Sequence, residues 1–119
     1  MSVDPPKSLR IGAYDFAIEL MPPAQVRAMG GHGSFSSSEL TIRVDDTPVS
    51  GPSAVDTLLH EIGHAIWFSY LLEDEDKEER VVATMATAWT QIYRDNPELL
   101  GWIEKTLRPE EAVTLRNVA

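Results

Sequence analysis

The sequence predicts an α+β fold in which a small antiparallel sheet of about three strands packs beside a central helix. Two stretches in the first half of the chain alternate apolar and polar residues, as strands with one buried face do. Three later stretches carry apolar residues at helical spacing, which predicts a central helix, a second helix and a short C-terminal helix. With 119 residues and no linker-like segment, residues 1–119 are expected to form a single domain.

The first strand is expected at residues 11–20, where apolar residues occupy every second position. Met21-Pro22-Pro23 ends it, because proline cannot donate a hydrogen bond to a strand ladder. Residues 1–9 carry Pro, Lys and Ser and are predicted to form a loose arm. At the other end, residues 108–119 are more polar and favour no particular structure.

Two further strands are expected before the central helix. Residues 24–29 fit either a helical turn or a loop, and the glycines of residues 30–33 predict a turn. A second strand at residues 34–37 is expected to run into a third at 39–44, where the alternation resumes. These strands predict an antiparallel meander, which the polar residues 45–48 close.

The central helix is predicted from a possible cap and from its apolar content. Ser53, with Asp56 three residues later, resembles a capping box, and the helix is expected to continue to about Leu72. Its apolar residues lie nearly all round, which predicts that it is well buried. A second helix is expected at residues 78–95, and Pro97 is well suited to open a short last helix at 97–107.

Composition excludes several classes of function. The formal net charge of −9 argues against binding to a nucleic-acid backbone and is compatible with attracting a cation. No apolar run approaches the roughly 18 residues of a membrane helix, and the N-terminus lacks the apolar core of a secretion signal. We therefore expect a soluble cytoplasmic domain with neither a membrane nor a nucleic-acid partner. Because the chain has no cysteine, a zinc site must use histidine and carboxylate ligands.

A metal-binding motif, His60-Glu61-Ile62-Gly63-His64, lies inside the predicted central helix. Helical residues four apart lie one above the other, about 6 Å along the axis, so two imidazoles can bind one tetrahedral Zn²⁺ through bonds of about 2 Å. Glu61 points about 100° away from His60 and is therefore expected to act on a metal-bound water as a general base, not as a ligand.

A catalytic zinc ion normally has three protein ligands and an open position for water. The second helix begins with Glu78 and Glu79, and either carboxylate could face the motif helix. Each lies on an apolar stripe of that helix, so periodicity does not separate them, and both would also stabilise the helix N-terminus. His32 is the alternative third ligand, although the glycine turn would have to bring it to the site.

An exposed strand beside the metal would allow a peptide substrate to add to the sheet as one more strand. The candidates are residues 39–44 and the preceding residues 34–38. If the scissile carbonyl were held against the zinc, His32, Tyr70 or Tyr93 could stabilise the oxyanion, and the sequence does not rank these three.

Three segments, residues 58–67, 78–82 and 93–99, together resemble small zinc metallopeptidases encoded by phages and prophages. These are similar to minimal gluzincins and, more distantly, to the ImmA/IrrE-type peptidases, and the resemblance covers roughly residues 30–100. It implies a small antiparallel sheet beside the motif helix and a third ligand on the next helix, which the pattern Glu-x-x-Val assigns to Glu79 rather than Glu78. The third histidine of metzincins is absent, because position 70 is Tyr.

Two functions follow from these observations. The first is a zinc-dependent peptidase of the cytoplasm, in a bacterial host if the gene is carried by a phage, with Glu61 as general base and His60, His64 and Glu79 as ligands. The second is a non-catalytic protein that zinc stabilises and that binds a host or virion partner. The second function shares the ligands but does not require Glu61.

Overall fold

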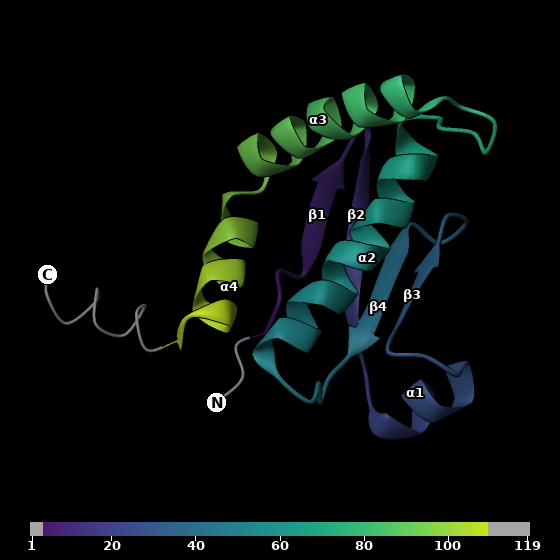
Figure 1. Ribbon diagram of the computed structural model, residues 1–119. Helices are drawn as coiled ribbons and strands as arrows, with labels where there is room; N and C mark the ends of the chain where they lie inside the picture. The colour runs from purple at the N-terminus through teal and green to yellow at the C-terminus, as the bar shows by residue number, and fades with distance from the viewer. Residues whose placement is uncertain (1–3, 110–119) are drawn as a thin grey trace, which may run out of the picture.

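A computed structural model describes residues 4–109 of the chain (Figure 1). Four strands and four helices follow one another in this order: β1 (Ser8–Ile11), β2 (Tyr14–Met21), α1 (Pro23–Met29), β3 (Gly33–Ser36), β4 (Thr41–Asp45), α2 (Gly51–Ser69), α3 (Glu78–Asp95) and α4 (Pro97–Leu107). The α+β class is confirmed. Of the arm predicted at residues 1–9 and the tail at 108–119, residues 1–3 and 110–119 lie outside the described part.

The sheet has four strands in the order β1-β2-β4-β3, so the prediction of a three-stranded antiparallel meander was wrong in both respects. Strands β1 and β2 pair antiparallel, as do β3 and β4, but β2 and β4 run parallel. The parallel pair arises because α1 carries the chain aside after β2. Strand β3 then runs at the outer edge, and β4 returns between β3 and β2.

The additional strand comes from a hairpin that the sequence pattern concealed. Residues 11–20 were predicted as one strand, but Gly12 has a φ of +62° and turns the chain between β1 and β2. Positive φ at the first of two turn residues is typical of a tight hairpin. Because Leu9 and Ile11 are fully buried, the end of the predicted loose arm is part of the sheet.

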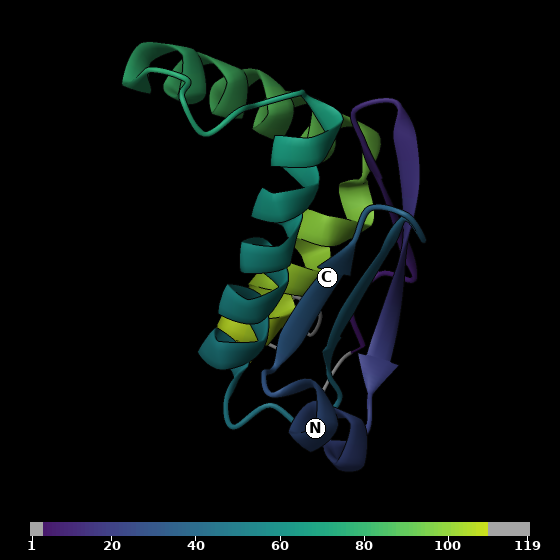
Figure 2. The same cartoon turned by 90° about the vertical axis from the view of Figure 1, so that its right-hand side faces the viewer.

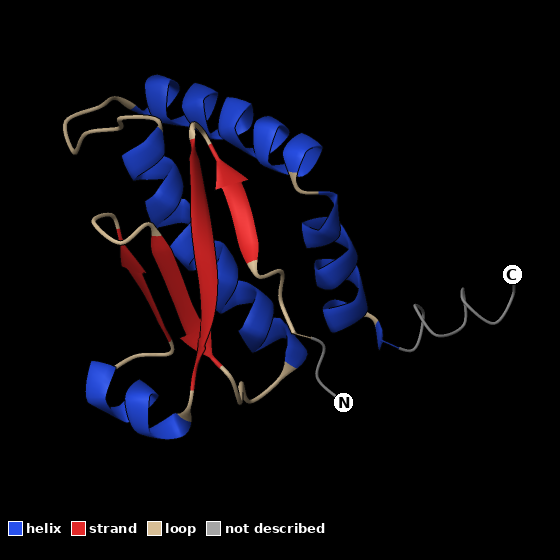
Figure 3. Cartoon of the chain, turned by 180° about the vertical axis from the view of Figure 1, so that it is seen from behind, coloured by secondary structure: helices blue, strands red, loops and turns tan. Residues whose placement is uncertain are grey.

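All the long helices lie on one face of the sheet (Figures 2 and 3). Helix α2 crosses this face, α4 packs alongside α2, and α3 lies across the end of the sheet against β1. The opposite face carries ion pairs such as Arg10–Asp15 and Arg43–Glu19. The core between the layers is formed by apolar residues of all these elements: Leu9, Ile11, Phe16, Ile42, Leu58, Ile62, Ala65, Ile66, Ala88, Ile92 and Leu99.

The helix boundaries agree with the predictions except at the two ends of α2. The N-cap is Ser50, whose Oγ accepts a hydrogen bond from the backbone N–H of Ser53, so the helix begins before the expected capping box. It ends at Ser69, with Leu71 in a left-handed conformation, whereas the prediction extended to Leu72. In the described part of the chain, no helix is both long and apolar enough to cross a membrane.

Candidate metal centre

Helix α2 brings His60 and His64 together on a surface of the molecule. Leu58 and Ile62 point into the core, which leaves the two histidines on the exposed side. Their ring centroids are 5.0 Å apart, and the rings are nearly perpendicular. Because imidazole nitrogens can turn toward a common point at this separation, the pair fits two ligands of one metal ion.

Glu61 has a different environment from its two neighbours. Only 6% of its surface is exposed, and none of the hydrogen bonds in the described part of the chain involves its carboxylate. Burial raises the pKa of Glu61, and the nearby His60 and His64 oppose that shift. The carboxylate oxygens of Glu61 are not among the fully buried, unpaired side-chain atoms of the described residues, so they reach solvent beside the two histidines.

Strand β3 lies directly over this carboxylate. A Cβ atom added to Gly33 would lie 2.8 Å from Glu61 Oε2 and 2.9 Å from Thr57 Cγ2, so only glycine allows the strand to come this close. Further along the strand, the Phe35 ring stacks at 6.4 Å from the ring of His64. Because β3 is an edge strand, its outer backbone groups face away from the sheet beside the motif (Figure 2).

The predicted third ligand is not brought to the two histidines. Glu78 and Glu79 lie exposed in the first turn of α3, which packs against β1 and α4 at the end of the sheet. Within residues 4–109, no group of three His, Asp or Glu side chains is arranged to hold a metal ion. The structure thus assembles His60, His64 and Glu61, which fit part of a catalytic zinc site.

His32, the alternative ligand, forms a different contact. Its Nδ1 lies 2.7 Å from Asp45 Oδ2. The pKa of Asp45 is lowered, mainly by a hydrogen bond from the Thr47 backbone N–H and then by His32. The imidazole of His32 therefore faces Asp45, although the next residue, Gly33, lies against Glu61 of the motif.

The two tyrosines proposed for the oxyanion also have other contacts. The Tyr70 hydroxyl donates a hydrogen bond of 3.0 Å to Gln91 Oε1, and burial raises the pKa of Tyr70. The Tyr93 ring stacks on Trp89 with centroids 5.4 Å apart, near the far end of α3. Neither contact orients a hydroxyl toward His60 and His64.

Two functional features were not found from the sequence. Gly33 was assigned only to a turn, although a glycine entering a strand can also mark a close approach of two backbones. The contact of Phe35 with His64 could not be predicted, since it depends on which strand lies at the edge. Comparisons with protein-family models, curated proteins and solved structures found no match to this chain.

Proposed function

We propose that this protein is a zinc-dependent peptidase in which His60 and His64 bind the metal and Glu61 is the general base. One observation carries the proposal: a solvent-accessible carboxylate that forms none of the hydrogen bonds of the described residues lies beside two exposed imidazoles and the edge strand β3. Structural carboxylates are normally hydrogen-bonded or paired when buried. This one is left available for a water molecule.

Bound Zn²⁺ supplies Lewis acidity that lowers the pKa of a coordinated water toward about 7. Glu61 would accept a proton from the attacking water as the water oxygen forms a bond to the peptide carbonyl carbon. Glu61 then delivers the proton to the departing amine nitrogen as the carbon–nitrogen bond breaks.

The free edge of β3 provides a place for the substrate backbone. A peptide that adds to β3 as a fifth strand gains main-chain hydrogen bonds and lies beside Gly33. Because Glu61 lies directly beneath Gly33, a bond held there is within reach of the base. This arrangement favours an extended peptide segment as substrate.

Glu79 is proposed as the third ligand, as the resemblance to gluzincins implies. The buried residues of α3 are Ala88 and Ile92, both in its second half, whereas Val82 near its start is 55% exposed. Few buried side chains therefore hold the first two turns, and the preceding residues 73–77 are exposed except for the half-buried Asp76. Zinc binding by Glu79 would require these turns to move toward His64.

Metal content and peptide cleavage test the proposal together. Glu61→Gln is expected to retain zinc and lose hydrolysis, since it keeps the shape of the side chain but removes the base. Hydrolysis at the wild-type rate by this variant would remove Glu61 from the mechanism. Glu79→Ala is expected to lose zinc and Glu78→Ala to retain it, and the opposite result would exchange their roles.

A second candidate function is a non-catalytic zinc protein that binds a host or virion partner. It is favoured by the exposure of His60 and His64 together with the absence of a third ligand near them within residues 4–109. A side chain of another protein could then complete the coordination. This function predicts that Glu61→Gln changes neither zinc content nor partner binding.

A further inference from the structure

An apolar pocket of about 480 Å³ opens beside His64, between β3 and the C-terminal end of α2. Trp67 and Phe68 line it from the helix, Leu71 and Leu72 from the segment after the helix, and Phe35 from the strand. Pockets of this volume accept small ligands or large side chains. Because His64 also lines the pocket, it is continuous with the candidate metal centre.

Leu71 is unusual both in exposure and in backbone conformation. Its surface is 77% exposed, and its φ is +59°, in the left-handed region. The position follows the end of α2, where Leu71 N donates to Phe68 O and Leu72 N donates to Trp67 O. Glycine is the usual residue at such a helix end. A strained, exposed leucine contributes little to the core, so its side chain at the pocket suggests a binding role.

The relative direction of β3 and α2 places the pocket on one side of the candidate base. Gly33 lies over Thr57 and Glu61. Two residues later, Phe35 contacts His64 and Phe68, so strand and helix run the same way. A peptide paired antiparallel to β3, the more stable type of pairing, therefore passes the pocket first and Glu61 afterwards.

We propose that this pocket binds a large apolar side chain of the peptide substrate, on the amino-terminal side of the cleaved bond, with Leu71 as a specificity-determining residue. The proposal rests on the peptidase function only for the position of the cleaved bond. Glu73 lies at the pocket and the chain carries a net charge of −9, so an acidic side chain is disfavoured.

Binding of short fluorescein-labelled peptides, measured by fluorescence anisotropy, tests the pocket without requiring catalysis. The parent peptide contains serine, threonine and glycine, and matched peptides carry one phenylalanine or one glutamate at the same position. The phenylalanine peptide is expected to bind about tenfold more tightly than the parent, because it buries an aromatic ring. The glutamate peptide is expected to bind no more tightly than the parent.

Leu71→Asn is the decisive variant, since asparagine tolerates the left-handed conformation and removes the apolar contact. It is expected to reduce the preference for phenylalanine to less than about threefold without lowering the melting temperature. Leu71→Gly should act in the same way. Leu100→Asn removes another exposed leucine, on α4 and outside the pocket, and should leave the preference unchanged.

Equal binding of the phenylalanine and parent peptides, or an unchanged preference in both Leu71 variants, would overturn the proposal. Loss of peptide binding as the protein self-associates would instead assign the pocket to a second copy. With zinc-loaded protein, mass spectrometry is expected to find cleavage on the carboxyl side of the phenylalanine, and cleavage on its amino side would overturn the assigned direction. Selective binding without any cleavage would refute the peptidase alone, whereas cleavage without a phenylalanine preference would refute the pocket alone.

Discussion

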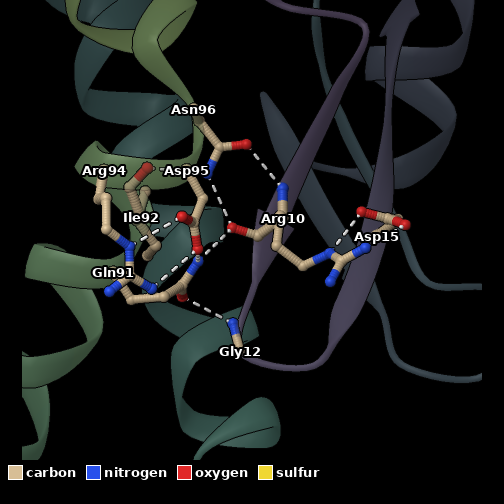
Figure 4. A network of polar contacts seen from close by, with 8 residues as sticks. All are labelled: Arg10, Gly12, Asp15, Gln91, Ile92, Arg94, Asp95 and Asn96. Carbon is tan, nitrogen blue, oxygen red and sulfur yellow. Dashed lines mark hydrogen bonds and ion pairs between the residues drawn. The ribbon is translucent and has the colours of Figure 1, made fainter.

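Two clusters of polar side chains in this molecule differ in how their hydrogen-bonding groups are used. The first, which we call the hairpin junction, joins the end of α3 to the β1–β2 hairpin through Gln91 and Asn96 (Figure 4). Asn96 accepts a 2.7 Å hydrogen bond from Arg10 N and donates 2.8 Å bonds to Arg10 O and Ile92 O. Gln91 accepts from Gly12 N and donates to Arg10 O.

The second cluster is the motif His60-Glu61-His64, and within the described part of the chain it has no such partners. Asn96 and Glu61 are both buried, with exposed fractions of 3% and 6%, yet only Asn96 is hydrogen-bonded by the protein itself. Buried polar groups satisfied internally stabilise a fold. Groups left unsatisfied at a surface opening are available to a ligand. The comparison therefore separates a cluster whose polar groups are satisfied within the protein from one whose polar groups are open to a ligand.

Removing a motif histidine should have the largest effect in either cluster, and it should weaken metal binding without destabilising the metal-free fold. His60→Ala is expected to weaken zinc binding by at least about 100-fold, because loss of an outer-shell partner alone costs 10–100-fold. The metal-free protein should unfold at nearly the wild-type temperature, since His60 is exposed. Titration with a zinc indicator and thermal melting without metal check the two parts. Undiminished zinc binding would show that the motif is not a metal site.

Removing the buried amide of the hairpin junction should lower the stability of the fold and leave zinc binding unchanged. Asn96→Ala is expected to lower the free energy of unfolding by about 2 kcal/mol, because it leaves backbone groups of Arg10 unsatisfied. Zinc affinity of the folded protein should not change. Urea unfolding and the zinc titration measure these quantities. If Asn96→Ala left stability unchanged but reduced zinc affinity, the assignment of the two clusters would be reversed.

The sequence predicted the arrangement of the motif side chains better than that of the hairpin junction, for a physical reason. The spacing of His60, Glu61 and His64 is local, because a helix of fixed geometry sets their relation. Asn96 was recognised only as the end of a helix before Pro97, since its partner Arg10 lies 86 residues away. Such a contact follows from tertiary packing and leaves no periodic signal.

The same distinction applies to the fold. The helices α3 and α4 were predicted closely, because apolar spacing and Pro97 define them locally. The parallel pairing of β2 with β4 was missed, since it depends on where α1 directs the chain. The position of Glu79 also depends on tertiary packing. For Glu79 to act as the proposed ligand, α3 must pack in a specific way against α2, which helical spacing alone does not encode.

A substitution at Gly33 tests the contact between Gly33 and Glu61. Its expected effect is smaller than that of the substitutions at His60 and Asn96. Gly33→Ala is expected to lower the free energy of unfolding by about 1–2 kcal/mol, because its Cβ must displace Glu61 or β3. The rate of hydrolysis should decrease by a larger factor than zinc affinity, because the substitution displaces the proposed base Glu61 and leaves His60 and His64 in place. Gly31→Ala is the matched control, because the nearest atom to its Cβ is 3.9 Å away. Equal effects of the two substitutions would show that the close approach is unimportant.

The smallest expected effect concerns Asp95, at the exposed edge of the hairpin junction. Hydrogen bonds from Arg94 and then Gln91 lower the pKa of Asp95 to about 2. Because the pKa is lower in the folded state, the carboxylate stabilises the protein above the unfolded pKa of about 3.9, and this contribution is lost as the pH falls toward 2. Asp95→Asn should therefore lower the urea midpoint slightly at neutral pH, and the difference should shrink on acidification.

Asp74→Asn is the control for that titration, since Asp74 makes none of the hydrogen bonds or ion pairs found in residues 4–109. It should leave the urea midpoint unchanged at neutral pH. A difference between Asp95→Asn and wild type that stayed constant down to acidic pH would show that the Asp95 charge does not support Gln91. The hairpin junction would then depend on its neutral amides alone, which would sharpen its contrast with a motif built around a carboxylate.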